Sequence, residues 1–393
     1  MALLALIAFF FLPSQQPKAI SRLYVAITLP AILTGPFVGL LIDRWNRKKV
    51  LIVCDSVRMI LVLFIPWIML WTRKIGFVYI LVFLVFLFTF FFNTARLSII
   101  PNLVSKKRLL AANSFVNIIG RVATLVGIVA GGMIVDWKLW SKIGIPGFSS
   151  GFYLDSLTYL VSLIAILTIT IKLKEKEKPV KIEEYSLFQQ LKREAKRVYQ
   201  DFKEAYYLIR GNPRVQLPIV SYTLLATLFA CLLVLFVPIV QSDLKLGTHG
   251  VGFIGGVGSI GLILSAFLFG MLGHRIRKEW VILGGFLMIG IFLSLGAFVK
   301  SVALLLPLAF IVGMVASPVM IVQDTLLHET VPEEIRGRIF SVKEWVMQVN
   351  LALSAFVVGL LTSFFSKRGL LCVIGVIVIL LSLLGTIFWR KVE

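Results

Sequence analysis

The chain repeats one local design in its two halves. The first copy, GLLIDRWNRKK, runs from Gly39 to Lys49, and the second, GMLGHRIRKEW, begins 231 positions later at Gly270. Another pair of segments, IPNLVSKKRLLAANS and VPEEIRGRIFSVKEW, places Pro101 and Pro332 at the same offset. Each segment is a short basic loop between long apolar runs, so the repeat predicts two homologous halves of a helical bundle embedded in a membrane.

Composition also places the chain in lipid. Hydrophobic residues make up 59% of it and charged residues only 15%, and the mean hydropathy is +0.96. An all-α, polytopic membrane protein is therefore expected. Runs long enough to cross about 30 Å of hydrocarbon predict eleven spans, near 19–42, 50–71, 77–100, 110–134, 151–171, 214–240, 249–273, 280–299, 302–326, 339–364 and 370–389.

The apolar segment 1–12 is too short to cross, and it lacks the basic and small-residue features of a signal peptide. Projecting the span 214–240 back by one repeat places its partner partly before Met1. We therefore expect the first helix to be truncated, through either a mis-assigned start or a real loss.

The repeat divides the chain into a first half at 1–171, a cytoplasmic linker at 172–213 and a second half at 214–393. The linker opens with a charged run and continues into a helical pattern with one apolar stripe, formed by Leu191, Ala195, Val198, Phe202, Tyr206 and Ile209. This pattern predicts an amphipathic helix along the cytoplasmic surface, ending at Gly211, Asn212 and Pro213.

Lysine and arginine set the expected orientation, because basic loops stay on the cytoplasmic side. One set of alternate loops, which includes the linker and the C-terminus, holds 26 of the 40 basic residues. The C-terminus is therefore predicted to be cytoplasmic. The formal charge of +21 favours contact with anionic lipid of the inner leaflet, and nucleic-acid binding is disfavoured because the basic residues are dispersed among loops.

Neither a metal nor a cofactor is expected. The three cysteines lie in separate apolar spans without C-x-x-C spacing, and the three histidines, His249, His274 and His328, are isolated in sequence. The chain also lacks the common nucleophile, zinc-binding and phosphate-loop motifs, so an enzyme is not expected and ATP is not the direct energy source.

The loop formed by Gly39, Asp43, Arg44, Arg47 and Lys48–Lys49 has the pattern G-x-x-x-D-R-x-x-R-K-K. It is similar to the signature loop of the major facilitator superfamily. The segments IPNLVSKKRLLAANS, YYLIRGNPRV and TVPEEIRGRIFS resemble the bacterial drug, macrolide and siderophore exporter branch of that superfamily. The resemblance covers nearly the whole chain, short of the first helix.

The resemblance implies a twelve-helix bundle of two six-helix halves that works by alternating access, with a substrate cavity between the halves. Gly39 would allow close helix approach, and the basic residues would pair with carboxylates in one conformer only and so set the balance between conformers. The expected gating residues are Gly39, Asp43, Arg44, Arg47, Lys48, Arg336 and Arg338. A plainer alternative is that Asp43 and Arg44 only cap and orient a turn.

The chain departs from the family pattern in three places. His274 stands where the first copy of the repeat has Asp43, so the first copy is the stronger gating candidate. Ile128 replaces the proline of the antiporter signature in the stretch Ala123–Gly132, which weakens an argument for proton antiport. The fourth span lacks the R-x-x-x-G pattern of many members, although its Arg96 fits the exporter branch.

Charges inside spans are costly and need a reason. Arg121 lies roughly 16 Å along its helix from the cytoplasmic end, and it would either meet an anionic group or form a fixed buried ion pair. Asp55 and Arg58, three residues apart, are expected to form a structural pair. Asp324 is a candidate protonatable group or a gate residue near the cytoplasmic end.

Polar residues of the spans that line the pathway in this superfamily complete the candidate site by analogy. The substrate or coupling candidates are Arg121, Asp324, Gln323, Asn93, Tyr222 and Thr227. The uncharged ones could equally join helices by hydrogen bonds.

The expected function is a secondary transporter of the bacterial cell membrane that exports an amphipathic small molecule, driven by an ion gradient with protons as one candidate ion. A monomer is expected. The alternatives are uptake, or a membrane scaffold or lipid-moving protein without coupled transport if the first helix is truly absent.

Overall fold

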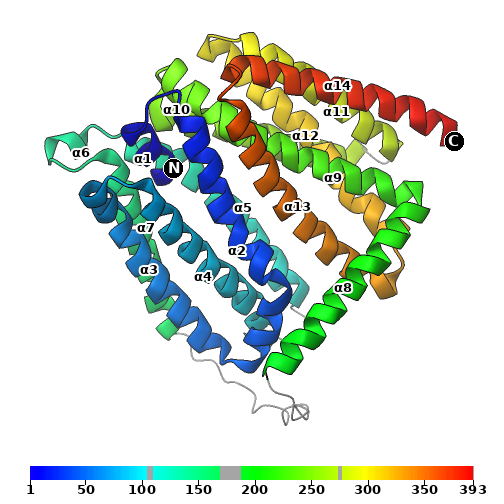
Figure 1. Ribbon diagram of the computed structural model, residues 1–393, viewed down its shortest axis with the longest axis horizontal. Coiled ribbons are helices and arrows are strands. Elements are labelled where there is room, and N and C mark those ends of the chain that lie inside the picture. The colour runs from blue at the N-terminus through cyan, green and yellow to red at the C-terminus, as the bar shows by residue number, and fades with distance from the viewer. Residues whose placement is uncertain (104–108, 169–186, 273–276, 393) are drawn as a thin grey trace. The chain divides into compact units, whose positions relative to one another are not determined.

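The structure is a computed structural model, and it describes residues 1–103, 109–168, 187–272 and 277–392. The described residues contain helices and no strand (Figure 1). The elements before the linker are α1 (Ala2–Phe10), α2 (Gln16–Arg44), α3 (Arg47–Thr72), α4 (Ile75–Leu103), α5 (Leu109–Val135), α6 (Leu139–Lys142) and α7 (Gly147–Thr168). The later ones are α8 (Leu187–Gly211), α9 (Pro213–Cys231), η2 (Leu232–Phe236), η3 (Ile239–Asp243), α10 (Gly247–Leu272), α11 (Lys278–Phe298), α12 (Val302–Thr330), α13 (Glu333–Leu361) and α14 (Lys367–Val392).

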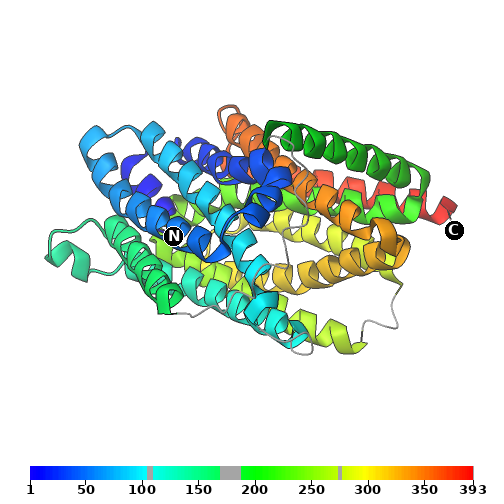
Figure 2. The same cartoon turned by 90° about the horizontal axis from the view of Figure 1, so that it is seen from below.

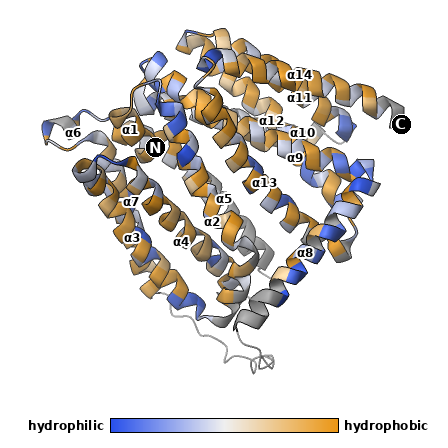
Figure 3. Cartoon of the chain, in the orientation of Figure 1, coloured by the Kyte–Doolittle hydropathy of each residue, from blue (hydrophilic) through white to orange (hydrophobic). Residues whose placement is uncertain are grey.

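Each of the eleven predicted spans falls on a helix over most of its length. Residues 169–171 and 273 lie outside the described ranges, and residues 299 and 362–364 lie just beyond the ends of α11 and α13. By length and composition, nine helices of the described part could cross a membrane, and Val122–Val135 is a shorter apolar stretch within α5. Figure 3 shows apolar residues along the long helices and many hydrophilic residues along α8. The all-helical membrane architecture is thereby confirmed.

The chain forms two compact units. One holds residues 26–124 and 140–204, and the other holds residues 1–25, 125–139 and 205–393. The division of the chain at 171 and 213 into two six-helix halves remains a prediction.

In the unit that holds 26–124, helices α2, α3, α4 and α7 share an apolar core formed by Val38, Ile42, Val50, Leu51, Cys54, Ala95, Ile99 and Ile166. These residues follow helical spacing on each helix, which is why one face of each helix is buried.

In the other unit, glycines let helices approach closely. A Cβ built on Gly290 of α11 would lie 2.8 Å from the carbonyl oxygen of Gly375 in α14, and one on Gly313 of α12 would lie 3.0 Å from the nitrogen of Leu262 in α10. Small residues suit helix contacts in a membrane, where van der Waals packing replaces the hydrophobic effect. Figures 1 and 2 show α11 and α14 running side by side.

The predicted span 214–240 is not a regular α-helix. After Cys231 the chain forms two wide turns with π-helical hydrogen bonding, η2 and η3, which lie on either side of Pro238. Proline lacks an N–H and its ring crowds the carbonyl four residues earlier, and a wider turn relieves that clash. The hydrophobic pattern alone predicted an uninterrupted helix here.

The helical part of the predicted linker corresponds to α8. Helix α8 ends at Gly211, the side chain of Asn212 accepts a hydrogen bond from the Arg214 nitrogen at 3.0 Å, and Pro213 opens α9. The start of the predicted linker, up to residue 186, lies outside the described residues.

Candidate functional site

The signature loop joins α2 to α3 with Asn46 as the N-cap of α3; its side chain accepts a hydrogen bond from the Lys49 nitrogen. Two basic side chains of the loop reach the ends of other helices. Arg47 Nη1 donates to the carbonyl of Ser98 at 2.6 Å, near the end of α4, and Lys48 Nζ donates to the carbonyl of Leu167 at 3.2 Å, at the end of α7. Cations at helix C-termini are stabilised by the helix dipole, by about 0.3–1 kcal/mol each.

The other gating candidates are only partly placed. The backbones of Asp43 and Arg44 end α2, and those of Arg336 and Arg338 lie in α13, but these four side chains are outside the described part of the structure, as is all of His274. At Gly39 no described atom lies within 4 Å of the place a Cβ would take, and its role in close helix approach stays a prediction.

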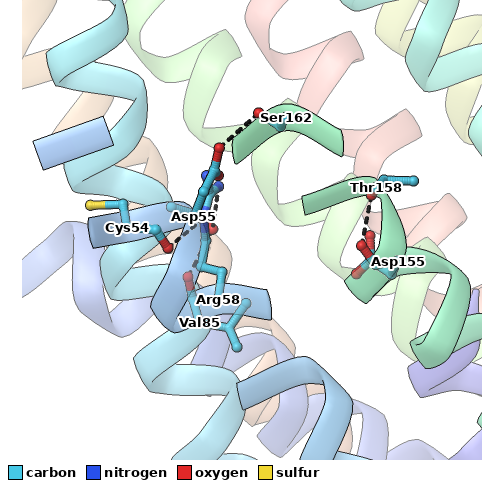
Figure 4. A network of polar contacts seen from close by, with 8 residues as sticks. Cys54, Asp55, Arg58, Val85, Asp155, Thr158 and Ser162 are labelled. Atoms are coloured by element: carbon cyan, nitrogen blue, oxygen red, sulfur yellow. Dashed lines mark hydrogen bonds and ion pairs between the residues drawn. The ribbon is translucent and has the colours of Figure 1, made fainter. Parts of the chain in front are cut away.

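The expected pair of Asp55 and Arg58 is confirmed. Arg58 Nη2 donates to Asp55 Oδ1 on the same helix, and the carboxylate's other oxygen accepts a hydrogen bond from Ser162 of α7 at 2.7 Å (Figure 4). The guanidinium carbon lies 4.1 Å from the ring centre of Phe92 in α4 and 4.7 Å from that of Tyr159 in α7.

Asp55 is fully buried and Arg58 is nearly so. Because both carboxylate oxygens have donors and the guanidinium rests against two rings, the charges are compensated locally. We interpret this cluster as a structural connection among α3, α4 and α7, and it leaves no carboxylate oxygen open to a ligand.

A second charged cluster brings together three helices of the other unit. The Tyr222 hydroxyl in α9 donates to Asp324 Oδ1 in α12, and Lys343 Nζ in α13 lies 3.4 Å from the same oxygen. The lysine ammonium also lies 4.1 Å from the ring centre of Tyr222 and 4.9 Å from that of Phe340. The structure thus joins two candidates, Tyr222 and Asp324, and adds Lys343.

The polar neighbours of this cluster differ in their hydrogen bonding. Gln323, next to Asp324, is fully buried, and neither atom of its amide has a partner among the described residues. Such a group is costly to bury unpaired and favours a water or a ligand as its partner.

Thr227 of α9 belongs to a hydrogen-bonded ladder between α9 and α13. Its hydroxyl lies 2.9 Å from Asn350 Nδ2 and 3.1 Å from Ser354 Oγ, and Asn350 also donates to the carbonyl of Thr223 at 2.7 Å. Thr227 and Ser354 also line a mainly apolar groove of about 290 Å³ between α9, α13 and α14. A groove of this kind offers both hydrogen bonds and apolar surface.

The remaining two candidates belong to the other compact unit. Asn93 is a half-buried residue of α4, and Arg121 lies on α5 with its side chain outside the described part of the structure. Neither residue is brought to Asp324 by a described contact.

The end of α5 packs closely on the start of α10, a contact that sequence reasoning missed. A Cβ on Gly132 would lie 2.9 Å from the Thr248 carbonyl oxygen, and one on Gly252 would lie 2.7 Å from the Ile128 carbonyl oxygen. Asp136 Oδ2 accepts a hydrogen bond from the His249 nitrogen at 2.7 Å and lies 3.0 Å from its Nδ1. The spacing of glycines in Ala123–Gly132 was the available signal, because small residues repeated on one helix face mark close approach.

His249 therefore serves as an interface residue and is not isolated in space. Among the described residues, no group of three or more His, Cys, Asp or Glu side chains could hold a metal ion.

A family model for the Major Facilitator Superfamily matches residues 1–239 and 219–393. BacE of Bacillus subtilis (strain 168), named for bacilysin export, is 26% identical over 352 residues, which cover 87% of this chain and 80% of BacE. NiaP of the same organism, named for niacin and nicotinamide transport, is 32% identical over 105 residues, covering 27% of this chain and 26% of NiaP. The chain also matches 45% of the length of YkuC, an uncharacterised transporter of that organism, at 28% identity.

Solved structures with little sequence identity share the fold. The nucleoside transporter NupG has a TM-score of 0.67 at 12% identity, covering 99% of this chain and 97% of that one. A bacterial homologue of the iron transporter ferroportin has a TM-score of 0.66 at 16% identity, covering 99% and 95%.

Proposed function

The chain belongs to the Major Facilitator Superfamily, and we propose that it is a secondary transporter that exports an amphipathic small molecule by alternating access. The observation that carries the proposal is the cluster of Tyr222, Asp324 and Lys343, where an exposed carboxylate stands within spanning helices beside a polar ladder. Charged residues inside spans of transporters mark pathways for substrates or ions.

Export is favoured over uptake because the relative named for export matches a larger share of this chain than the relative named for niacin and nicotinamide transport. BacE matches 87% of the chain and is named for export, whereas NiaP matches 27%. An amphipathic substrate fits the combination of charged and polar side chains with the apolar groove beside Thr227.

We further propose that the signature loop acts in gating, through Gly39, Asp43, Arg44, Arg47 and Lys48 together with Arg336 and Arg338 of the second half. Arg47 and Lys48 bond to helix-end carbonyls in the present conformation. An exchange of these partners for carboxylates in another conformer would bias the equilibrium between the two.

The substrate or coupling residues in this proposal are Arg121, Asp324, Gln323, Asn93, Tyr222 and Thr227. An ion gradient supplies the energy, with the proton as the candidate ion. The protein would act as a monomer in the cell membrane with its C-terminus in the cytoplasm, against anionic lipid. A scaffold without transport is disfavoured by membership of a transporter family.

The test is efflux of a fluorescent amphipathic cation and, separately, of a fluorescent anion from cells expressing the chain, with and without a protonophore. Protonophore-sensitive efflux of either dye, lost in Asp43→Asn at equal expression, is the expected result. Accumulation above the empty-vector level would indicate uptake, and no difference from the empty vector for either dye would contradict the proposal. Selective loss of anion efflux in Arg121→Ala would assign that arginine to an anionic substrate.

A further inference from the structure

We propose that Asp324 forms the binding site for a positively charged group of the transported molecule, so that the substrate class is an organic cation with an apolar body. This inference rests on the proposed transport function and adds the charge of the substrate. The observation behind it is that the Asp324 carboxylate is much more exposed to solvent than the Lys343 ammonium.

Among the described residues, the Asp324 carboxylate has partners at only one of its oxygens. Tyr222 and Lys343 both approach Oδ1, and no described residue donates a hydrogen bond to Oδ2. The Asp324 side chain is 55% exposed, on a helix long and apolar enough to cross a membrane. An exposed carboxylate on such a helix faces water, in a pathway or at the cytoplasmic end, because contact with lipid would be far more costly.

The Lys343 ammonium is the covered member of the pair. Its side chain is 11% exposed, and its charge lies against two aromatic rings and Asp324 Oδ1. An anionic substrate would have to displace these contacts to reach the ammonium. A cation can approach Asp324 Oδ2 directly.

Further negative charge lies beside the pair. Glu344, next to Lys343, is exposed and accepts a hydrogen bond from Gln348 at 3.4 Å. The described part of the cluster thus holds two carboxylates and one ammonium, within a chain whose formal charge is +21. Excess carboxylate charge favours a cation as the group that enters.

The apolar part of the ligand follows from the surroundings. Tyr222 and Phe340 already hold one ammonium on their faces, and aromatic faces attract organic cations in the same way. Lys343 therefore acts as an internal competitor, occupying Asp324 when no substrate is bound.

Removing the charge of Lys343 and removing the charge of Asp324 should change the affinity for a cation in opposite directions. Purified protein in lipid nanodiscs would be titrated with ethidium as the cationic probe and carboxyfluorescein as the anionic probe, with empty nanodiscs as the blank. We expect Asp324→Asn to weaken ethidium binding about 10-fold or more, the size of one lost charge-assisted contact. Lys343→Met should tighten ethidium binding by about 3-fold or more, because the competing ammonium is gone.

The matched control is a second carboxylate and lysine pair, which joins the end of α12 to the start of α11. Glu329 and Lys278 lie 2.5 Å apart, and Glu329→Gln and Lys278→Met should leave ethidium binding within about 2-fold, the scatter normal for exposed pairs. Asp324→Glu, which keeps the charge, should retain binding. If Asp324→Asn fails to fold, the change in ethidium affinity in Lys343→Met tests the proposal: tighter binding supports the cation site and weaker binding contradicts it.

Four outcomes would overturn the cation site: no ethidium binding, preference for carboxyfluorescein, unchanged binding in Asp324→Asn, or weaker binding in Lys343→Met. These outcomes are separable from failure of transport. Protonophore-sensitive efflux of the anion alone would support the transporter and contradict the cation site. Ethidium binding without efflux of any dye would support the cation site and contradict the transporter.

Discussion

At the scale of single residues, Asp55 and Arg58 show how a charged pair is accommodated inside a spanning helix. The i, i+3 spacing predicted their contact from sequence. The donation from Ser162, 107 positions later, and the rings of Phe92 and Tyr159 could not be predicted, because sequence does not reveal which helix faces adjoin. The same limit applies to Lys343, which joins Asp324 only through the packing of three helices.

The stability of the protein should depend on keeping or removing both charges of the buried pair Asp55 and Arg58 together. Arg58→Met leaves the Asp55 carboxylate buried without its counter-ion and should destabilise the protein by about 3–5 kcal/mol. The double variant Asp55→Asn with Arg58→Met should recover much of that loss, because no charge remains. Thermal unfolding in detergent measures both, and a double variant less stable than Arg58→Met alone would contradict a structural ion pair.

At the scale of elements, the helices were largely predictable because long apolar runs can satisfy their backbone in lipid only as helices. The wide turns around Pro238 were missed, since hydrophobicity carries no information about hydrogen-bond pattern. The approach of α5 to α10 was not predicted, because the spacing of glycines shows that a helix can pack closely but not which helix it packs against.

Two glycines of α5 provide a matched comparison. A Cβ on Gly132 would lie 2.9 Å from the Thr248 carbonyl oxygen and 3.1 Å from the His249 Cα, backbone atoms that cannot rotate away, whereas one on Gly120 has no described atom within 4 Å. Gly132→Ala should therefore destabilise by about 1–3 kcal/mol. Gly120→Ala should be neutral or stabilising by up to about 1 kcal/mol, because alanine favours the helix.

Melting temperatures of the two alanine variants in one detergent give the comparison. Equal melting temperatures would mean that α5 and α10 can move apart at little cost in free energy, and that the close contact contributes little to stability.

At the scale of the whole molecule, the signature loop and the internal repeat were enough to predict the family. They do not predict the substrate, because a binding surface depends on side chains from several helices, as Tyr222, Asp324 and Lys343 show. The orientation in the membrane is likewise a prediction from basic loops.

That orientation can be measured with single cysteines at two exposed lysines, in a background where Cys54, Cys231 and Cys372 are replaced by serine. Lys142→Cys, at the end of α6, should react with a membrane-impermeant maleimide in intact cells. Lys203→Cys, in α8, should react only after permeabilisation. Both positions are exposed in the structure, so the reverse labelling pattern would mean that the orientation is inverted.

The contacts of Arg47 and Lys48 have a mechanical consequence. They fasten one short loop to the ends of α4 and α7, and Asp55 and Ser162 join α3 to α7 deeper in the same unit. Three helices held at two levels resist shear against one another. A force applied at the loop would therefore rotate α3, α4 and α7 together as one rigid body. The backbone changes of a transport cycle would then occur at hinges outside these three helices.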